Sequence, residues 1–303
     1  MSSTVNEIWE AISKAAASLA DQTGKAVVAI DTGHRVAASG VHWKAGIVVS
    51  ASHLVRRAEE VDVILPNGNS VRGSVSGRDS TTDLAVIRID DSSAVATLAI
   101  ATGTNVGELV LAVARSRRGE LSASAGIMAR IGGAWQTWRG GQVDRLLRPD
   151  VRLYPGQSGS ALVNGRGELI GINSSVLARE SVITLPTETI DRVVSELLER
   201  GHVAQPYLGI AMQEVSLPSE WRCSAAGERG LLVMHVAPDT PARQAGVNLG
   251  DVIISAESHT LQSVRQFYRL LMQKRVGETL ELGLVRGGSP IETKVTLGDR
   301  PRR

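Results

Sequence analysis

The sequence predicts a mainly β protein in two parts, a β-rich N-terminal domain followed by a smaller α+β module. The first observation is the length, because 303 residues fit two domains of roughly 100–200 residues each. The second is a series of short Val- and Ile-rich runs between about Lys25 and Thr184, separated by turn residues. The third is a change of pattern at Thr187, where helical periodicity begins. A hydrophobic fraction of 43% and a charged fraction of 21% are typical of a globular protein with real cores.

Residues 1–24 precede the β-rich region, and we expect them to form an amphipathic N-terminal helix. Ala11 to Ala20 is rich in apolar residues, but Ser13 and Lys14 interrupt it. A secretory signal begins with basic residues, and Met1 to Glu10 holds no Lys or Arg. We therefore expect a cytoplasmic protein. No membrane span is expected either, because no apolar run reaches the roughly 18 residues that a spanning helix needs.

The β-rich region contains strand-like runs at the spacing of a sandwich or barrel. The runs are Lys25–Ile30, Gly46–Ser50, Val61–Leu65, Val71–Val75 and Leu84–Ile89. They recur roughly every 8–12 residues, as short strands of such folds do. Asn67-Gly68 lies between two of them and favours a tight hairpin, because both residues tolerate the positive φ angles that such a turn requires.

A helix is expected from Thr187, and Gly201 is expected to end it. The apolar residues that share one of its faces are Ile190, Val193, Val194, Leu197 and Leu198. The segment 201–206 is interpreted as a linker. The predicted domains are therefore residues 25–200 and residues 207–300.

The module 207–300 is predicted to be compact and α+β. Its expected strands are Leu231–Val236, Asp251–Ser255, Thr279–Val285 and Ile291–Leu297. Its expected helices run from Pro241 to Gly246 and from Leu261 to Leu271. Proline suits the first turn of a helix, where its missing N–H has no partner to lose.

Charge and cysteine content narrow the classes of function. The net charge is only +2, so the broad basic surface of a nucleic-acid-binding protein is not expected. Two arginine clusters indicate solvated loops or a local anionic partner. They are Arg115, Arg117 and Arg118, and then Arg145, Arg148 and Arg152. The single cysteine, Cys223, rules out an intrachain disulfide and is consistent with a reducing compartment.

The chemistry of a serine hydrolase is suggested by three residues in order. Such an enzyme needs a hydroxyl, a base that takes its proton, and a buried carboxylate that orients the base. His53, Asp83 and Ser158 occur in the order of the chymotrypsin-type triad. Ser158 lies between Gly156 and Gly159, which permit a tight turn that exposes a hydroxyl. Each residue alone also fits an ordinary turn, cap or loop.

Three blocks resemble the signature blocks of HtrA/Deg-type serine proteases. They are Val48–Val55 (VVSASHLV), Thr82–Ile89 (TDLAVIRI) and Gly156–Asn173 (GQSGSALVNGRGELIGIN). Two later segments, Tyr207–Ile210 (YLGI) and Val236–Ile254 (VAPDTPARQAGVNLGDVII), resemble the C-terminal PDZ domain of that family. The resemblance implies a chymotrypsin-like double β-barrel protease domain followed by an α+β PDZ domain.

The resemblance also implies a role for each candidate residue. Ser158 would be the nucleophile, His53 the general base and acid, and Asp83 the carboxylate that orients His53. The N–H groups of Gly156 and Ser158 would form the oxyanion hole, with Gln157 between them in the loop. Such proteases use no metal or other cofactor, and the histidines of this chain have no metal-site spacing.

The implied partners are proteins and peptides. Unfolded or damaged proteins would be the substrates, and the chain would assemble as a homotrimer. In the PDZ domain, a peptide C-terminus would be bound by a backbone loop. The residues of that loop are Tyr207, Leu208, Gly209 and Ile210.

The sequence departs from the family pattern in several places, among them Val182–Pro186, where the family usually has Gly-Phe-Ala-Ile-Pro. Ser160 stands where glycine is usual, and its side chain would narrow the substrate path or tilt the loop. Ala114–Gly119 replaces a Gly-Asn-Pro-Phe-Gly turn, and Arg152 borders the expected primary pocket in place of a small side chain. These departures support an alternative hypothesis, a catalytically weak or inactive peptide-binding, chaperone-like sensor. The complete triad favours an active endopeptidase.

Overall fold

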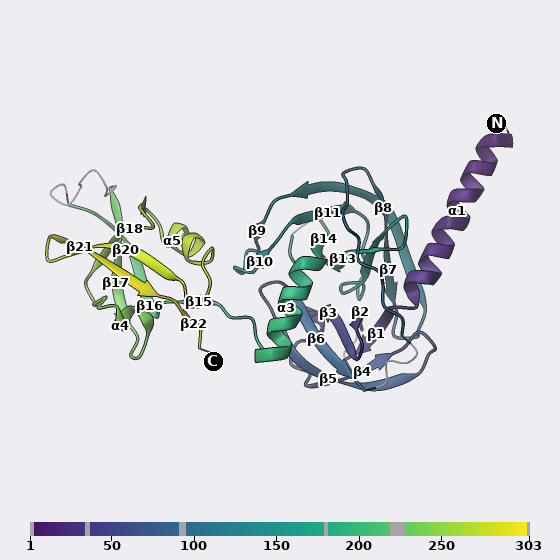
Figure 1. The fold of residues 1–303 in the computed structure, drawn as a ribbon, viewed down its shortest axis with the longest axis horizontal. Helices are drawn as coiled ribbons and strands as arrows, with labels where there is room; N and C mark the ends of the chain where they lie inside the picture. Colours follow the sequence, from purple (N-terminus) through teal and green to yellow (C-terminus); the bar gives the residue numbers. More distant parts are fainter. Residues whose placement is uncertain (1–2, 34–36, 91–94, 179–180, 219–227, 302–303) are drawn as a thin grey trace. The chain divides into compact units, whose positions relative to one another are not determined.

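The computed structural model describes residues 3–33, 37–90, 95–178, 181–218 and 228–301, and Cys223 lies outside these ranges. The chain forms two compact units, residues 1–203 and residues 204–303. Figure 1 shows that strands make up most of both units. The predicted mainly β fold class is confirmed, because the first unit contains two closed six-stranded barrels and the second contains a separate sheet.

The first barrel has the closed strand order β1-β2-β3-β6-β5-β4. Its strands are β1 (Val27–Asp31), β2 (Ala38–Lys44), β3 (Ile47–Ala51), β4 (Glu60–Ile64), β5 (Ser70–Asp79) and β6 (Leu84–Ile89). In β1, Val28 and Ile30 join the core inside the barrel, while Val27 joins a second core outside it. Burial on both faces explains the uninterrupted apolar run in this strand. The predicted Asn67-Gly68 hairpin is confirmed, since β4 and β5 pair antiparallel across it, but of the two turn residues only Gly68 takes a positive φ, of 85°.

The second barrel has the closed strand order β11-β14-β13-β12-β7-β8. Its strands are β7 (Leu109–Arg115), β8 (Leu121–Gly132), β11 (Leu146–Asp150), β12 (Ala161–Asn164), β13 (Leu169–Ser174) and β14 (Ile183–Pro186). A small hairpin of β9 (Trp135–Gln136) and β10 (Gln142–Val143) lies between β8 and β11 in the sequence. The interior is filled by a compact apolar cluster that includes Met128, Leu147 and Leu162.

A shared apolar core joins the two barrels. Its members come from β1, β2, β3 and β6 of the first barrel, from β7, β12, β13 and β14 of the second, from β10, and from α3 (Thr187–Arg200). Gly201 ends α3 as expected, in the left-handed conformation with a φ of 70°. Close-packed cores resist relative movement of the elements that share them. The two barrels therefore present their facing loops in a fixed relation.

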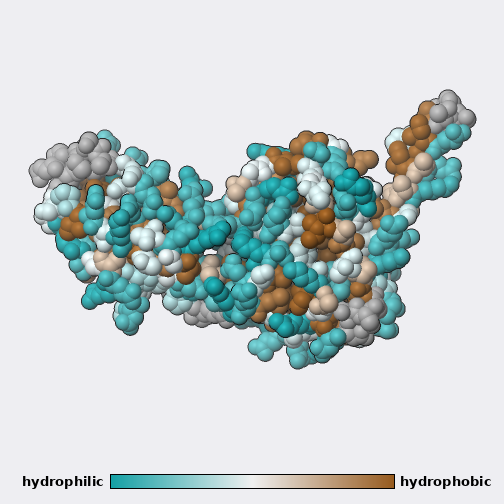
Figure 2. Space-filling view, viewed as in Figure 1, coloured by the Kyte–Doolittle hydropathy of each residue, from teal (hydrophilic) through white to brown (hydrophobic). Residues whose placement is uncertain are grey.

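The N-terminal helix α1 (Ser3–Gly24) is partly packed and partly exposed. Its C-terminal end lies against β7 and β8, and Thr23 and Gly24 are buried there. Figure 2 shows apolar side chains along the part of α1 near the N-terminus. The exposed apolar residues of this part are Val5, Ile8, Trp9 and Ile12. Among the helices in the described ranges, none has the length and apolar character needed to span a membrane.

The second unit is built on a sheet with the order β16-β17-β18-β20-β21, to which β19 adds on β18. Its strands are β16 (Ile210–Ser216), β17 (Arg229–Val236), β18 (Val252–Ala256), β19 (His259–Thr260), β20 (Thr279–Arg286) and β21 (Ser289–Thr296). Two helices, α4 (Pro241–Gln244) and α5 (Val264–Leu271), complete it. Helix α5 begins later than the expected Leu261, because the Ser263 hydroxyl accepts the Gln266 N–H at 3.2 Å and caps the helix there.

A short two-stranded ladder joins the start and the end of this unit. Strand β15 (Pro206–Tyr207) pairs with β22 (Gly298–Asp299), with Pro206 opposite Asp299 and Tyr207 opposite Gly298. Pro206, which the sequence assigned to the linker, is thus part of a strand. The ladder brings the C-terminal tail beside the loop that follows β15.

Candidate active site

His53 and Asp83 come from the first barrel and are in direct contact. His53 is the second residue of the short helix α2 (Ser52–Val55), which follows β3 directly. Its Nδ1 lies 2.9 Å from each carboxylate oxygen of Asp83, and its backbone N–H donates to Asp83 Oδ1 at 2.9 Å. The imidazole is therefore oriented through Nδ1, which leaves its other ring nitrogen for chemistry.

Asp83 is held in the turn before β6 at some conformational cost. Its φ is 61°, a left-handed conformation that is uncommon for any residue other than glycine. The side chain is 3% exposed and also accepts a hydrogen bond from the Ser174 hydroxyl at 2.6 Å. A buried carboxylate is costly unless donors compensate it, and His53 and Ser174 supply them. Strained residues held by several contacts are typical of functional sites.

Ser158 comes from the second barrel, in the loop between β11 and β12. A turn closed by the Gln157 N–H on the Tyr154 carbonyl at 3.0 Å precedes it, and Gly156 takes a φ of 89° in this turn. Gly159 has a φ of 88°, and a Cβ on it would collide with the backbone oxygen of Ser39. Glycine is therefore required at 159, and the loop is pressed against the first barrel.

Two consecutive residues bring the three candidates together. Ser174 donates to Asp83, while Ser175 lies 2.8 Å from Ser158, hydroxyl oxygen to hydroxyl oxygen. The Ser175 N–H also donates to Ser158 Oγ at 3.1 Å. Within the described ranges, Ser158 Oγ makes no hydrogen bond to His53. The two barrels thus bring the three residues to one place, with the serine hydroxyl turned toward Ser175.

The backbone of the loop leaves two donors free at the expected oxyanion site. The N–H groups of Gly156 and Ser158 have no acceptor among the described residues, whereas the N–H of Gln157 closes the turn. The Gln157 side chain is directed elsewhere, donating to Ser122 Oγ at 2.8 Å and accepting from the Tyr154 N–H at 2.8 Å. A buried backbone N–H group without an acceptor is rare in folded proteins, and Ser158 is buried while Gly156 is half-buried. The pair is therefore suited to a ligand oxygen.

Ser160 is part of a buried network and does not border an open path. Its side chain is fully buried, and its hydroxyl accepts a hydrogen bond from Asn173 Nδ2 at 3.1 Å. Asn173 Oδ1 in turn accepts from the Thr184 hydroxyl at 2.7 Å. The expectation that Ser160 narrows the substrate path is therefore wrong, because its hydroxyl points into the second barrel and is satisfied there.

Arg115 is not in a solvated loop, unlike its neighbours. Its side chain is 6% exposed, while Arg117 and Arg118 are exposed as expected. The guanidinium donates to three backbone carbonyls, those of Gly24, Val27 and Gly119, at 2.6 to 2.7 Å. Burial lowers the pKa of Arg115, but carbonyl dipoles satisfy the cation.

Ser39 connects Arg115 to the nucleophile loop. Its hydroxyl accepts the Arg115 N–H at 3.1 Å and lies 3.2 Å from the Arg115 carbonyl oxygen. Its own N–H donates to the Ser158 carbonyl at 3.2 Å. A continuous hydrogen-bonded path therefore runs from the end of α1 through Arg115 and Ser39 to Ser158.

Arg152 lies on the strand-like segment before the nucleophile loop and is exposed. Its guanidinium carbon lies 4.9 Å from the centre of the Tyr154 ring. Such stacking restrains a cation without burying it. Among the described residues, no group of three or more His, Cys, Asp or Glu side chains could hold a metal ion.

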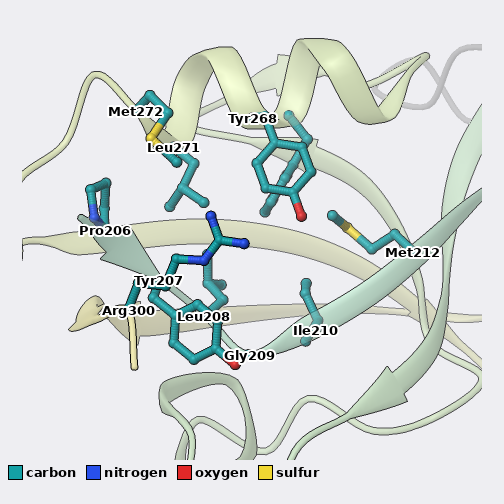
Figure 3. A pocket seen from close by; sticks show the side chains of 11 residues that line it. Pro206, Tyr207, Leu208, Gly209, Ile210, Met212, Tyr268, Leu271, Met272 and Arg300 are labelled. Atoms are coloured by element: carbon teal, nitrogen blue, oxygen red, sulfur yellow. The ribbon is translucent and has the colours of Figure 1, made fainter. Parts of the chain in front are cut away.

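A second candidate site lies in the C-terminal unit, in a groove beside β15, β16 and α5. Figure 3 shows its side chains, which are mostly apolar. The lining residues are Pro206, Tyr207, Leu208, Gly209, Ile210, Met212, Phe267, Tyr268, Leu271, Met272 and Arg300. All four predicted peptide-binding residues are among them, whereas Met212, Tyr268 and Arg300 were not predicted from the sequence.

Comparisons with known proteins match both units. The family model for a trypsin-like peptidase domain matches residues 38–172, and that for a PDZ domain matches residues 206–297. The chain is 30% identical over 269 residues to a Do-like HtrA serine protease of Lactobacillus helveticus, covering 83% of this chain and 65% of that protein. It is 29% identical over 259 residues to a periplasmic pH-dependent serine endoprotease, DegQ, of Escherichia coli, covering 83% of this chain and 56% of that protein.

Solved structures share the fold. A serine endoprotease from Yersinia pestis is 28% identical with a TM-score of 0.69, over 94% of this chain and 98% of that chain. A structure of the HtrA-type protease AlgW with a decapeptide has a TM-score of 0.71 at 22% identity, over 95% of this chain and 99% of that chain, which supports the fold. The chain spans about two thirds or less of the length of the curated relatives described above. The cytoplasmic location expected from the sequence stays a prediction.

Proposed function

For this chain, which belongs to the HtrA-type serine proteases with one C-terminal PDZ domain, we propose the function of a serine endopeptidase that cleaves unfolded or damaged proteins. The observation that carries the proposal is the contact of His53 Nδ1 with both carboxylate oxygens of Asp83 at 2.9 Å. The contacts of Ser174 and Ser175 support the convergence of this pair with Ser158.

The proposed reaction proceeds through an acyl-enzyme. Ser158 Oγ leaves Ser175, donates its proton to His53 Nε2 and attacks the peptide carbonyl carbon. Asp83 stabilises the imidazolium that forms, while the N–H groups of Gly156 and Ser158 bind the oxyanion. His53 then protonates the leaving amine, and water hydrolyses the ester on Ser158 with His53 again acting as base.

The experiment that tests this proposal compares the wild-type chain with Ser158→Ala. Both are incubated with casein as an unfolded substrate and with a fluorophosphonate probe that labels activated serines. We expect cleavage and labelling in the wild type and neither in the variant. Absence of both in the wild type would overturn the endopeptidase proposal.

The C-terminal unit is proposed to bind peptide C-termini. Backbone addition to a sheet edge and capture of a terminal carboxylate by N–H groups are the PDZ binding mode. The carbonyls of Leu208 and Gly209 accept the N–H groups of Ala242 and Ala237 at 3.0 and 2.9 Å. The N–H groups of Leu208 and Gly209 themselves have no acceptor among the described residues, although both residues are buried. A carboxylate in the groove would satisfy them.

A homotrimer is proposed as the assembled form, as the family resemblance implies. Exposed apolar side chains on α1 support self-association, because contiguous apolar surface marks interaction sites. Sedimentation equilibrium should give three times the chain mass of 32.1 kDa. Replacing Ile8 and Ile12 together by Asp should yield smaller species, and a monomeric wild type would contradict the proposal.

One observation favours a second candidate function. The Ser158 hydroxyl is engaged by Ser175 and not by His53, which suits a peptide-binding, chaperone-like sensor with little turnover. The same experiment separates the two functions. Probe labelling without cleavage of casein would indicate a gated site, and peptide binding without labelling would support the sensor.

A further inference from the structure

We propose that Arg300, which directly follows β22, is part of the peptide-terminus site and pairs with the terminal α-carboxylate of a bound peptide. The proposal rests on the proposed peptide-binding function of the C-terminal unit and names a residue outside the loop Tyr207–Ile210. The ligand class is a peptide with a free C-terminal carboxylate and an apolar last side chain.

The backbone of Arg300 is fixed at the groove. Its N–H donates to the Gln205 carbonyl at 3.0 Å. The Gln205 N–H donates to the Asp299 carboxylate at 3.0 Å, and Asp299 pairs with Pro206 in the ladder of β15 and β22. Because β15 leads directly into Leu208 and Gly209, the same ladder fixes the loop and Arg300 together. Arg300 is thus anchored to the site rather than carried on a free tail.

Arg300 carries the one charged side chain among the described residues that line the groove. The other ten lining residues are apolar, aromatic or glycine. Figure 3 shows the guanidinium directed into the groove, between Leu271 on one side and Tyr207 on the other. It makes no hydrogen bond or ion pair with any other residue that the structure describes. An unpaired cation in an otherwise neutral groove is complementary to an anionic ligand group.

The geometry of the groove favours a terminal carboxylate as that group. The free N–H groups of Leu208 and Gly209 supply two donors, and a guanidinium can add two parallel N–H donors to one carboxylate. The rest of the groove, including Met212, Tyr268 and Leu271, offers apolar contact to the last side chain of the peptide. A peptide with an amidated terminus would keep the apolar contact and lose the charge pairing.

The test measures peptide affinity in the full chain carrying Ser158→Ala, so that the probes are not cleaved. The probes are fluorescein-labelled octapeptides that end in Val, Leu, Phe or Tyr, each as the free acid and as the amide. Binding is followed by fluorescence polarisation for Arg300, Arg300→Gln and Arg300→Lys. Arg275→Gln serves as the matched control, because Arg275 is an exposed arginine of the same unit that does not line the groove.

We expect Arg300→Gln to weaken binding of the free acids about tenfold, as loss of a charge-assisted contact does. Binding of the amides should change by less than about twofold, and Arg300→Lys should restore part of the affinity because it keeps the charge but not the planar fork. Added salt should reduce the difference between Arg300 and Arg300→Gln. The Arg275→Gln variant should bind as the parent does.

Two results would overturn the proposal. One contradicts the role of Arg300 alone, and the other contradicts the peptide-terminus function on which that role rests. If the parent prefers acids to amides and Arg300→Gln keeps the same preference, Arg300 has no role while the peptide-terminus function stands. If the parent binds acids and amides equally, or binds neither, the peptide-terminus function itself fails, and the role of Arg300 fails with it.

Discussion

The hydroxyl oxygen of Ser158 lies 2.8 Å from the hydroxyl oxygen of Ser175, the residue directly after β13. A serine hydroxyl is a poor base, so this contact cannot activate the nucleophile. His53 meanwhile is held by Asp83 whether or not Ser158 faces it. The two halves of the proposed triad are therefore formed separately, and rotation of one side chain is the step that would join them.

Replacing Ser175 by Ala should raise the reactivity of Ser158. The change removes a competing hydrogen-bond partner, while the backbone N–H of residue 175 is kept. A neutral hydrogen bond contributes about 0.5–1.5 kcal/mol, which corresponds to roughly a two- to tenfold gain in the rotamer that faces His53. The measurement is the rate of fluorophosphonate labelling at neutral pH.

The matched control for Ser175→Ala is Ser76→Ala. Ser76 lies in β5 of the first barrel and accepts a hydrogen bond from Arg88 Nε at 3.1 Å, away from the site. Its labelling rate should equal that of the wild type. An unchanged or slower rate in Ser175→Ala would show that Ser175 does not compete with His53.

Replacing Asp83 by Asn should abolish most of the activity without unfolding the chain. An amide at 83 can donate to His53 Nδ1, which stabilises the wrong tautomer of the imidazole, and in trypsin-type triads this lowers kcat by about 10⁴-fold. Ser174→Ala, which removes only the hydrogen bond at 2.6 Å to Asp83 Oδ2, should cost about tenfold or less. Steady-state cleavage of casein measures both, and equal losses in the two variants would contradict the assigned roles.

The sequence could predict those residues of the candidate site whose immediate neighbours in the chain have a recognisable pattern. His53 follows a strand-like run, Asp83 precedes one, and Ser158 has glycines at fixed offsets. Each can therefore be recognised from a few neighbouring residues. The strands were visible for the same reason, since burial on both faces leaves a continuous apolar run such as Val27–Ile30. Local patterns therefore sufficed for the fold class and for three candidate residues.

Residues that act through long-range contacts could not be predicted from the sequence. Ser39 and Ser175 are small polar residues whose partners lie far along the chain, and nothing in their own neighbourhoods sets them apart. Arg115 was misread because it belongs to a basic segment, although its guanidinium reaches carbonyls of α1 and β1. Arg300 was missed because it follows the last long strand, and only the β15–β22 ladder brings it to the groove.

Replacing Arg115 by Met should destabilise the first unit. The buried carbonyls of Gly24 and Val27 and the partly buried carbonyl of Gly119 would lose a donor, and unsatisfied buried groups cost about 1–3 kcal/mol each before relaxation and hydration. A net loss of about 3 kcal/mol lowers the Tm of a unit of this size by roughly 6–12 °C. Calorimetry measures the shift, and Arg118→Met, at an exposed position of the same loop, should change Tm by less than about 2 °C.

The same variant tests whether the path through Ser39 affects the nucleophile. At a temperature where Arg115→Met is folded, the labelling rate of Ser158 should fall relative to Arg118→Met, because the backbone of residue 115, to which Ser39 is hydrogen-bonded, is no longer anchored by the guanidinium. A normal rate in the folded variant would mean that Arg115 stabilises the barrels and does not position Ser158.

Replacing Asp251 by Asn should remove a pH-dependent part of the stability of the C-terminal unit. Burial alone raises the pKa of Asp251, but hydrogen bonds from Arg286 at 2.7 and 2.8 Å and from the Asn248 N–H outweigh it, so the pKa is held below its ordinary value.

A carboxyl whose pKa is lowered on folding stabilises the folded state above the unfolded pKa of about 3.9, and this contribution is lost as the pH falls through the folded pKa. We expect Asp251→Asn to unfold at a lower temperature than the wild type at pH 7, by about 5 °C, and to show a smaller deficit at pH 3 than at pH 7. Asp239→Asn, at an exposed position with a φ of 56° that Asn also tolerates, should match the wild type at both pH values in calorimetry. An Asp251→Asn deficit of equal size at pH 3 and pH 7 would mean that packing, and not the charge of Asp251, provides the stability.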